Sequence, residues 1–294
     1  MNQILVTGGT GIIGSYFKKV FNTTNFTYLG SKDCNLNSIS AVREYFSDTN
    51  KYDILIFLVG LAHEKGKKSK LSEFNEINFQ TLVNILSVFA ESNKIPDKII
   101  FASTISIYGE RFHQNTYTED SSKKPLSPYA ITKLKAEQYL LKNYFNKSWI
   151  LRLAPIYSST FFLNIDRRTK IGSYFFCVGN GSNKLSLCNI NNVKSSVENI
   201  IIDKVPPNIY NVSDTKYYSY KELLNWQSSS FTLWVPKILV KILYYYGKIF
   251  RNIFLQENTV KLLSDNIYPN NKISAFIELP FTLNNINRNR RVNS

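Results

Sequence analysis

The chain has 294 residues, of which 44% are hydrophobic, enough for one α/β domain or a large domain that carries a smaller one. Its cysteines, Cys34, Cys177 and Cys188, show no CxxC spacing and no accompanying histidines, so we expect neither a disulfide framework nor a metal site, and a cytoplasmic location fits. The net charge of +15 favours a phosphorylated ligand, whereas the spread of the lysines and the lack of a known module exclude a nucleic-acid partner. The N-terminus shows no signal-peptide pattern.

Short apolar runs alternate with amphipathic stretches over residues 1–160. We expect strands at Gln3–Val6, Phe26–Leu29, Asp53–Val59, Lys98–Ser103 and Trp149–Leu153. Helices are predicted at Gly11–Phe21, Ser38–Phe46, Phe74–Ser92 and Pro128–Phe145. The third strand is apolar on both faces, as in a sheet covered by helices above and below. This pattern predicts an α/β fold with a Rossmann-type, doubly wound parallel sheet over 1–160.

The first predicted strand runs into Thr7-Gly8-Gly9-Thr10-Gly11-Ile12-Ile13-Gly14. Three glycines between a strand and a helix are the context of a dinucleotide-binding loop. The first allows a tight turn, the second a close approach to the pyrophosphate, and the third close packing of helix on sheet. The amides at the start of the helix supply the anion site. We therefore expect cofactor contacts from Gly8, Thr10, Gly11, Ile12 and Gly14.

The end of the second strand bears on the choice between NAD and NADP. A carboxylate normally ends this strand and binds the adenosine ribose. Here the usual position holds Gly30 or Ser31, Lys32 follows, and Asp33 is expected to open the next segment. Without the carboxylate, and with Ser31 and Lys32 available to a 2′-phosphate, this chemistry favours NADP or a relaxed choice, and NAD stays open.

A second motif, Tyr129-Ala130-Ile131-Thr132-Lys133, opens the fourth predicted helix. Tyr129 and Lys133 lie one turn apart and face the same way. The lysine charge is expected to lower the pKa of the phenol from about 10, which would suit the tyrosine to proton transfer. A hydroxyl that holds the substrate oxygen is expected within Phe101–Gly109, at the carboxyl end of a strand.

Together these motifs resemble those of the extended short-chain dehydrogenase/reductases, the nucleotide-sugar epimerases, dehydratases and reductases. Thr7–Gly14 is similar to the family's TGxxGxxG, and Ser103–Gly109 to its S-[ST]-x-x-V-Y-G. The resemblance implies that Tyr129, Lys133 and Thr104 are the catalytic residues, with Thr104 selected by its spacing from the tyrosine. Lys133 would also position the cofactor ribose.

The resemblance extends to other cofactor contacts and to the substrate. Ala62 lies in a segment that looks like the family's cofactor-lining segment, and Asn78 matches the asparagine of its N-x-x-G-T helix, where this chain has Gln80 for the glycine. The strand end implies substrate contacts from Ser103, Ser106 and Tyr108.

The C-terminal third is similar to the sugar-nucleotide regions of polysaccharide-cluster epimerases and 4-keto reductases. The segments that carry this likeness are Val178–Ser186, Asn191–Val193 and Tyr210–Asp214. Where many relatives place an arginine for the diphosphate, this chain has Leu185, so Lys184 beside it is the expected substitute. We expect 161–286 to form a smaller, mixed α/β substrate-binding region interleaved with the first, and 287–294 to be a frayed tail.

The resemblance implies hydride chemistry at C4 of a sugar on a nucleotide or polyprenyl diphosphate. The expected activity is a 4-epimerase of surface-polysaccharide precursor synthesis, and the alternative is an NADPH-dependent 4-keto reductase. A dehydratase is disfavoured because Ile105 and Ser106 stand where it places an acid pair. A non-catalytic dinucleotide sensor is a remote alternative. A homodimer through the helix that carries Tyr129 is expected.

Residues 234–255 combine apolar and basic side chains. Lys237, Lys241, Lys248 and Arg251 fall near one helical side, opposite Ile238, Ile242, Tyr245 and Ile249. So many cations argue against a spanning helix. Two interpretations stay open: an amphipathic helix on the inner face of the membrane, or a helix that packs its apolar face on the core.

Overall fold

The computed structural model describes residues 2–61 and 70–286. Two compact units share the chain, and each is made of separate segments. The first unit contains Met1–Ile107, Pro128–Arg152 and Val197–Tyr210. The second contains Tyr108–Ser127, Leu153–Ser196 and Asn211–Ser294. The predicted cofactor contact Ala62 and the predicted tail 287–294 lie outside the described residues.

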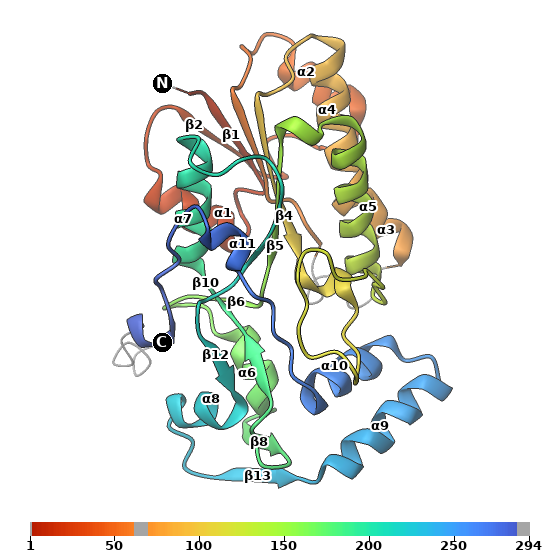
Figure 1. Cartoon of the computed structure of the whole chain (residues 1–294). Coiled ribbons are helices and arrows are strands. Elements are labelled where there is room, and N and C mark those ends of the chain that lie inside the picture. The colour runs from red at the N-terminus through yellow and green to blue at the C-terminus, as the bar shows by residue number, and fades with distance from the viewer. Residues whose placement is uncertain (1, 62–69, 287–294) are drawn as a thin grey trace. The chain divides into compact units, whose positions relative to one another are not determined.

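A six-stranded sheet in the order β11-β5-β4-β3-β1-β2 dominates the first unit (Figure 1). Its strands are β1 Ile4–Thr7, β2 Phe26–Leu29, β3 Ile54–Phe57, β4 Lys98–Thr104, β5 Ser148–Leu153 and β11 Ile209–Val212. The pairs β1–β2, β1–β3 and β3–β4 are parallel. The chain moves from β1 to β2 on one side and then to β3 on the other, so the winding reverses at β1. This confirms the predicted Rossmann-type fold, whose ligands bind at the carboxyl ends of the strands at such a reversal.

Helices flank this sheet (Figure 1). Their bounds are α1 Ile12–Val20, α2 Ile39–Phe46, α3 Leu71–Asn75, α4 Thr81–Glu91 and α5 Pro128–Asn143, followed by α7 Ile190–Ile201. The Ser38 hydroxyl caps α2 by accepting the Ala41 amide, as expected of a serine at a helix start. The single helix predicted over 74–92 is instead interrupted by a π-helical turn, η1, at Glu76–Gln80. Single π-helical turns of this kind occur inside α-helices, and the prediction covered the whole stretch as one helix.

The core of the first unit lies between one face of the sheet and α2, α4 and α5. Leu5, Leu55 and Ile99 occupy neighbouring positions in register on β1, β3 and β4, and all are fully buried. Val42 of α2 and Leu86 of α4 belong to the same apolar cluster. Because these strands are parallel, their carboxyl ends lie at the same edge of the sheet, where the polar groups of the site follow them.

A buried ion pair fastens α5 to the sheet. Glu137 on α5 and Arg152 on β5 are almost completely excluded from solvent, and their Oε2 and Nη2 atoms lie 2.8 Å apart. The Arg152 Nε donates to the same carboxylate at 3.2 Å. Ser103, near the end of β4, donates a hydrogen bond from its hydroxyl to the Glu137 carboxylate. The carboxylate therefore ties α5 to two neighbouring strands at once.

Short strands and helices make up the second unit. The strand pairs are β6 Ile156–Tyr157 with β10 Cys188–Asn189, and β9 Lys184–Ser186 with β12 Tyr217–Ser219. A three-stranded sheet consists of β7 Lys170–Ile171, β8 Tyr174–Val178 and β13 Thr232–Val235. The helices are α6 Leu163–Thr169, α8 Tyr220–Trp226, α9 Lys237–Ile249, α10 Ile253–Leu263 and α11 Asn271–Ser274. Of the helices within 2–61 and 70–286, none is long and apolar enough to cross a bilayer.

The ion pair leads to a stability prediction. Glu137→Gln leaves the Arg152 charge buried without its partner, so the free energy of unfolding should fall by about 3 kcal/mol or more. Urea denaturation of the purified chain measures this. The matched control is Glu91→Gln, which removes the partner of Arg43 in an exposed pair of similar length, 3.0 Å, and should cost less than about 1 kcal/mol. Equal losses in the two variants would contradict the role given to Glu137.

Candidate active site

The glycine loop after β1 has the geometry of a dinucleotide cradle. Gly8 adopts a φ of +76°, and a Cβ atom there would lie 2.9 Å from the Leu58 carbonyl carbon. A Cβ atom on Gly14 would collide with the Gly8 carbonyl oxygen. The Gly11 amide donates to that same oxygen at 3.0 Å, which closes the turn. These positions exclude side chains and bring bare backbone to the start of α1, so the loop fits a pyrophosphate.

The first turn of α1 leaves its amides available to an anion. Gly11 precedes the helix and has no side chain with which to cap it, and no acidic residue lies in the first turn. Thr10 and Ile12 are exposed beside the loop. The partial positive charge of a helix start favours a phosphate at this place.

A carboxylate does lie at the end of β2, contrary to the sequence-based expectation. The Asp33 Oδ2 atom accepts the Gly30 amide at 2.7 Å, because the chain turns back on itself after the strand. A Cβ atom on Gly30 would lie 3.0 Å from the Thr10 side chain and 3.3 Å from the Asp33 carboxylate. Ser31 and Lys32 are exposed. Asp33 is therefore a candidate for the ribose hydroxyls that residue spacing missed.

Asn78 lies in the π-helical turn and connects three segments of the first unit. Its Oδ1 accepts the Leu61 amide at 2.6 Å, and its Nδ2 donates to the Leu61 carbonyl at 3.3 Å and to the Thr132 hydroxyl at 3.1 Å. The side chain is fully buried. Asn78 thus holds the segment after β3 against α5, and a π-helical turn at such a place is common in functional sites.

Lys133 is held by backbone oxygens beneath this segment. Its Nζ donates to the carbonyls of Val59 and Ala102, each at 2.9 Å, and lies 4.7 Å from the centre of the Phe101 ring. Burial lowers the pKa of Lys133 to about 7, while the Glu137 carboxylate one turn further along α5 raises it in part. The lysine is positioned by fixed acceptors, and its charge depends on pH near neutrality.

Tyr129 and Thr104 are hydrogen bonded to each other. Burial raises the pKa of Tyr129 to about 12, and the hydrogen bond from Thr104 only partly offsets this. The expectation that Lys133 lowers the phenol pKa is therefore wrong, because desolvation is the larger effect. The Thr104 Oγ1 also accepts the Ser106 amide at 3.2 Å, which fixes the hydroxyl at the end of β4.

The predicted substrate contacts differ in what their side chains do. The Ser103 hydroxyl is used by Glu137. Tyr108 is fully buried in the second unit, where its hydroxyl donates to Asn211 at 2.6 Å. Lys184 is exposed, and its backbone amide donates to Asp265 at 2.8 Å, while Leu185 next to it is buried. Lys184 is thus free at its charged end, whereas Ser103 and Tyr108 are engaged in packing the structure.

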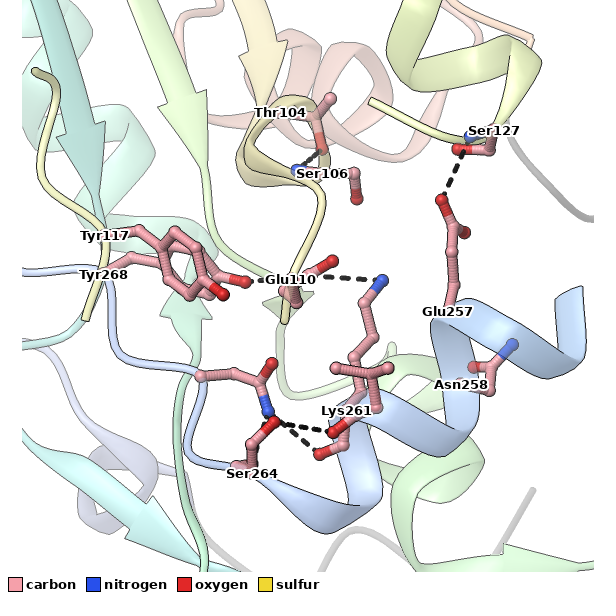
Figure 2. Close-up of polar contacts among 12 residues, drawn as sticks. Thr104, Ser106, Glu110, Tyr117, Ser127, Glu257, Asn258, Lys261, Ser264 and Tyr268 are labelled. Carbon is pink, nitrogen blue, oxygen red and sulfur yellow. Dashed lines mark hydrogen bonds and ion pairs between the residues drawn. The ribbon is translucent and has the colours of Figure 1, made fainter. Parts of the chain in front are cut away.

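Sequence reasoning missed a polar cluster in the second unit. Figure 2 shows Glu110 between Tyr268, whose hydroxyl donates to it at 2.7 Å, and Lys261, whose Nζ lies 3.4 Å away. All three side chains are buried. Among the described residues the buried Ser127 hydroxyl has no hydrogen-bond partner, although its amide donates to Glu257 at 3.1 Å. No local motif marks these residues, since they come from distant parts of the chain.

The sequence model of the NAD dependent epimerase/dehydratase family matches residues 4–184. A Homo sapiens dTDP-D-glucose 4,6-dehydratase is 26% identical over 163 residues, which are 47% of this chain and 45% of that protein. A Dictyostelium discoideum UDP-glucose 4-epimerase is 27% identical over 165 residues, 47% of this chain and 46% of that protein. The chain thus spans about half the length of the curated relatives it matches.

Solved structures resemble the fold over nearly the whole chain. The UDP-glucuronic acid 4-epimerase from Bacillus cereus, in complex with NAD, matches with a TM-score of 0.66 and 19% identity over 95% of this chain and 94% of that one. The dTDP-4-dehydrorhamnose reductase from Bacillus anthracis, in complex with NADP, gives a TM-score of 0.68 and 16% identity over 95% of each. Together with the family match, these likenesses confirm the resemblance drawn from the motifs.

The environment of Lys133 predicts how stability depends on pH. Because the folded protein holds a proton here with a pKa of about 7, while a lysine in the unfolded chain has a pKa of about 10.4, the unfolded chain binds more protons between these values. The contribution of Lys133 to the free energy of unfolding should therefore rise with pH above 7, by at most about 1.4 kcal/mol per pH unit.

Urea denaturation from pH 7 to 9.5 measures this slope. Lys133→Met should remove it, so the difference between wild type and variant grows with pH. Lys135→Met is the matched control, because Lys135 is exposed on the same helix and should leave the slope unchanged. Parallel curves for wild type and Lys133→Met would show that the lysine is not desolvated.

Proposed function

Because the chain belongs to the NAD dependent epimerase/dehydratase family, a family of enzymes, we propose that it is a 4-epimerase of sugars carried on a nucleotide or polyprenyl diphosphate. The observation that supports this most is the hydrogen-bonded pair of Tyr129 and Thr104 beside the buried Lys133. The pair is built to hold one substrate oxygen and to move its proton. We place the reaction in the synthesis of surface-polysaccharide precursors.

In this proposal Tyr129 takes the proton of the C4 hydroxyl as that carbon is oxidised and returns it when the carbon is reduced on its other face. Thr104 donates a hydrogen bond to the same C4 oxygen of the substrate and orients the phenol of Tyr129. The dinucleotide, when bound, supplies the hydride acceptor and donor and, in its oxidised form, a positive charge. When Lys133 is protonated, its positive charge favours the Tyr129 phenolate. Burial of Tyr129 opposes formation of that phenolate.

The pyrophosphate would be held by the glycine loop and the start of α1, through Gly8, Thr10, Gly11, Ile12 and Gly14. Asn78 would hold the segment that lines the cofactor site. Asp33 would hold the ribose of NAD. Its carboxylate at the end of β2 favours NAD, and hence the epimerase, because a 2′-phosphate would meet a negative charge there. The exposed Lys32 is the observation that favours the alternative, an NADPH-dependent 4-keto-sugar reductase.

Lys184 and Lys261 are the proposed contacts of the sugar's diphosphate in the second unit. Lys261 is buried and forms an ion pair with Glu110, whereas the Lys184 side chain is exposed to solvent. We place the enzyme in the cytoplasm, which the buried, unpaired thiols of Cys34, Cys177 and Cys188 support. We also propose a homodimer through α5, on which Ile131 is exposed.

Removal of the Tyr129 hydroxyl tests the proposed reaction. Tyr129→Phe should lower kcat for interconversion of a 4-epimeric pair of UDP-sugars by about 10³-fold, since proton transfer is lost, and should leave the Kd for NAD within about threefold. Tyr139→Phe on the same helix is the matched control and should retain activity. Epimers are separated by chromatography and NAD binding is followed by calorimetry. Unchanged turnover in Tyr129→Phe would overturn the mechanism.

The cofactor choice depends on two neighbouring side chains. Asp33→Asn keeps an acceptor for the Gly30 amide but loses the charge, so the Kd for NAD should rise about tenfold while that for NADP stays or falls. Lys32→Ala, its matched control, should weaken NADP and leave NAD unchanged. Calorimetric titration of wild type and both variants with NAD and with NADP gives the six dissociation constants. A wild type that prefers NADP, with no effect of Asp33→Asn on NAD, would support the reductase instead.

A further inference from the structure

Helix α9 in the second unit touches its core along a narrow stripe only. Val240 is buried and packs with Phe176 and Val178 of β8. About two turns later, Gly247 is also buried, and a Cβ atom there would lie 2.9 Å from the Leu255 side chain of α10. Between them, the Tyr244 ring lies 4.7 Å from that of Phe112. These contacts occupy one side of the helix and define which side is left to solvent.

The side opposite that stripe is apolar and exposed. Ile238, Ile242, Tyr245 and Ile249 recur at helical spacing and are 62%, 56%, 59% and 76% exposed. The interpretation that α9 packs this face on the core is therefore wrong within the described unit. Exposed apolar side chains continue on both sides in sequence: Leu233, Trp234, Phe250 and Phe254. Soluble proteins seldom expose so many large apolar side chains within one short segment unless something covers them.

The three-stranded sheet before α9 adds to this surface. A shallow pocket of about 160 Å³ on that sheet is lined by apolar side chains alone: Ile171, Tyr174, Phe175, Phe176, Phe231 and Leu233. Leu233 belongs to β13, which leads through Pro236 directly into α9 (Figure 1). We call β13 together with the exposed side of α9 the β13–α9 surface.

Positive charge borders this surface. At 100° per residue, Lys237, Lys241 and Lys248 fall within about 40° of one another, along one flank of the exposed apolar side. Arg251 follows the helix. No Asp or Glu occurs in the sequence between Glu222 and Glu257, although the whole chain contains 21 acidic residues. This positive rim is complementary to a surface of negative charge, and the segment itself contains no carboxylate to neutralise it.

We propose that the β13–α9 surface docks on a bilayer that contains anionic lipids, with the helix lying in the plane of the headgroups. An apolar face with lysines on its flank and aromatic rings at its edges is the composition of such interfacial helices. The 13 residues of α9 extend only about 20 Å, too short to span. This inference concerns where the protein works and does not depend on the reaction proposed above.

Sedimentation with vesicles tests the docking with the full chain. Binding to vesicles of 70% phosphatidylcholine and 30% phosphatidylglycerol should be at least about tenfold stronger than to phosphatidylcholine alone, and should weaken in 0.5 M NaCl. Ile242→Glu with Ile249→Glu should reduce the binding at least about thirtyfold. Both sites are exposed, so folding should be unaffected. Ile202→Glu is the matched control, since Ile202 is 58% exposed in the first unit.

The charged rim has its own test. Lys241→Glu with Lys248→Glu should lower binding to the anionic vesicles at least about tenfold, whereas Lys18→Glu with Lys204→Glu, at exposed sites elsewhere, should change it far less. Equal binding to both vesicle types, or full binding by the Ile242→Glu, Ile249→Glu variant, would overturn the proposal. A third result would also overturn it: wild type that does not bind vesicles and elutes as a dimer in gel filtration, with the Ile242→Glu, Ile249→Glu variant eluting as a monomer. A second copy of the chain would then cover the β13–α9 surface.

Discussion

The ion pair between Glu137 and Arg152 is almost completely excluded from solvent, and the candidate active site is built upon it. Removing two charges from water is costly, and only close contact and further hydrogen bonds offset that cost. Here the Glu137 carboxylate also accepts a hydrogen bond from the Ser103 hydroxyl and lies one turn beyond Lys133 on α5. One buried group thus fixes the position of the helix that carries Tyr129 and supplies the negative charge that keeps the lysine from losing its proton more readily still.

Burial opposes the charged form of both proposed catalytic groups, Tyr129 and Lys133. Burial raises the pKa of Tyr129 and lowers that of Lys133, so neither the phenolate nor the ammonium is favoured at neutral pH without help. Thr104 and Glu137 each reduce the imbalance from within the protein. The hydrogen bonds of these two side chains are thus set in advance, as in sites whose fixed dipoles stabilise charge that develops during a reaction.

Local patterns in the sequence predicted much of this architecture. The strand pattern, the glycine loop and the Tyr129–Lys133 spacing predicted the Rossmann-type sheet, and the structure and comparisons confirm it. What failed depends on contacts between distant residues. Asp33 folds back onto Gly30 through a turn that spacing does not show. Desolvation reverses the expected shift in the Tyr129 pKa. Tyr129, Lys133 and Glu137 follow one another at intervals of four residues on the same helix. This spacing, together with the Arg152 in Leu151-Arg152, was the signal in the sequence that could have predicted the Glu137–Arg152 ion pair.

Hydride transfer to and from the same sugar carbon is the central claim. It is tested most directly with a nucleotide sugar that carries deuterium at C4, incubated with the purified chain and NAD but with no NADPH or other added reductant. The account predicts that the 4-epimer forms and keeps the deuterium at C4, because the hydride taken from that carbon is returned to it. If no epimer forms, and the chain instead reduces a 4-keto sugar when NADPH is supplied, the account is contradicted and the chain is a reductase.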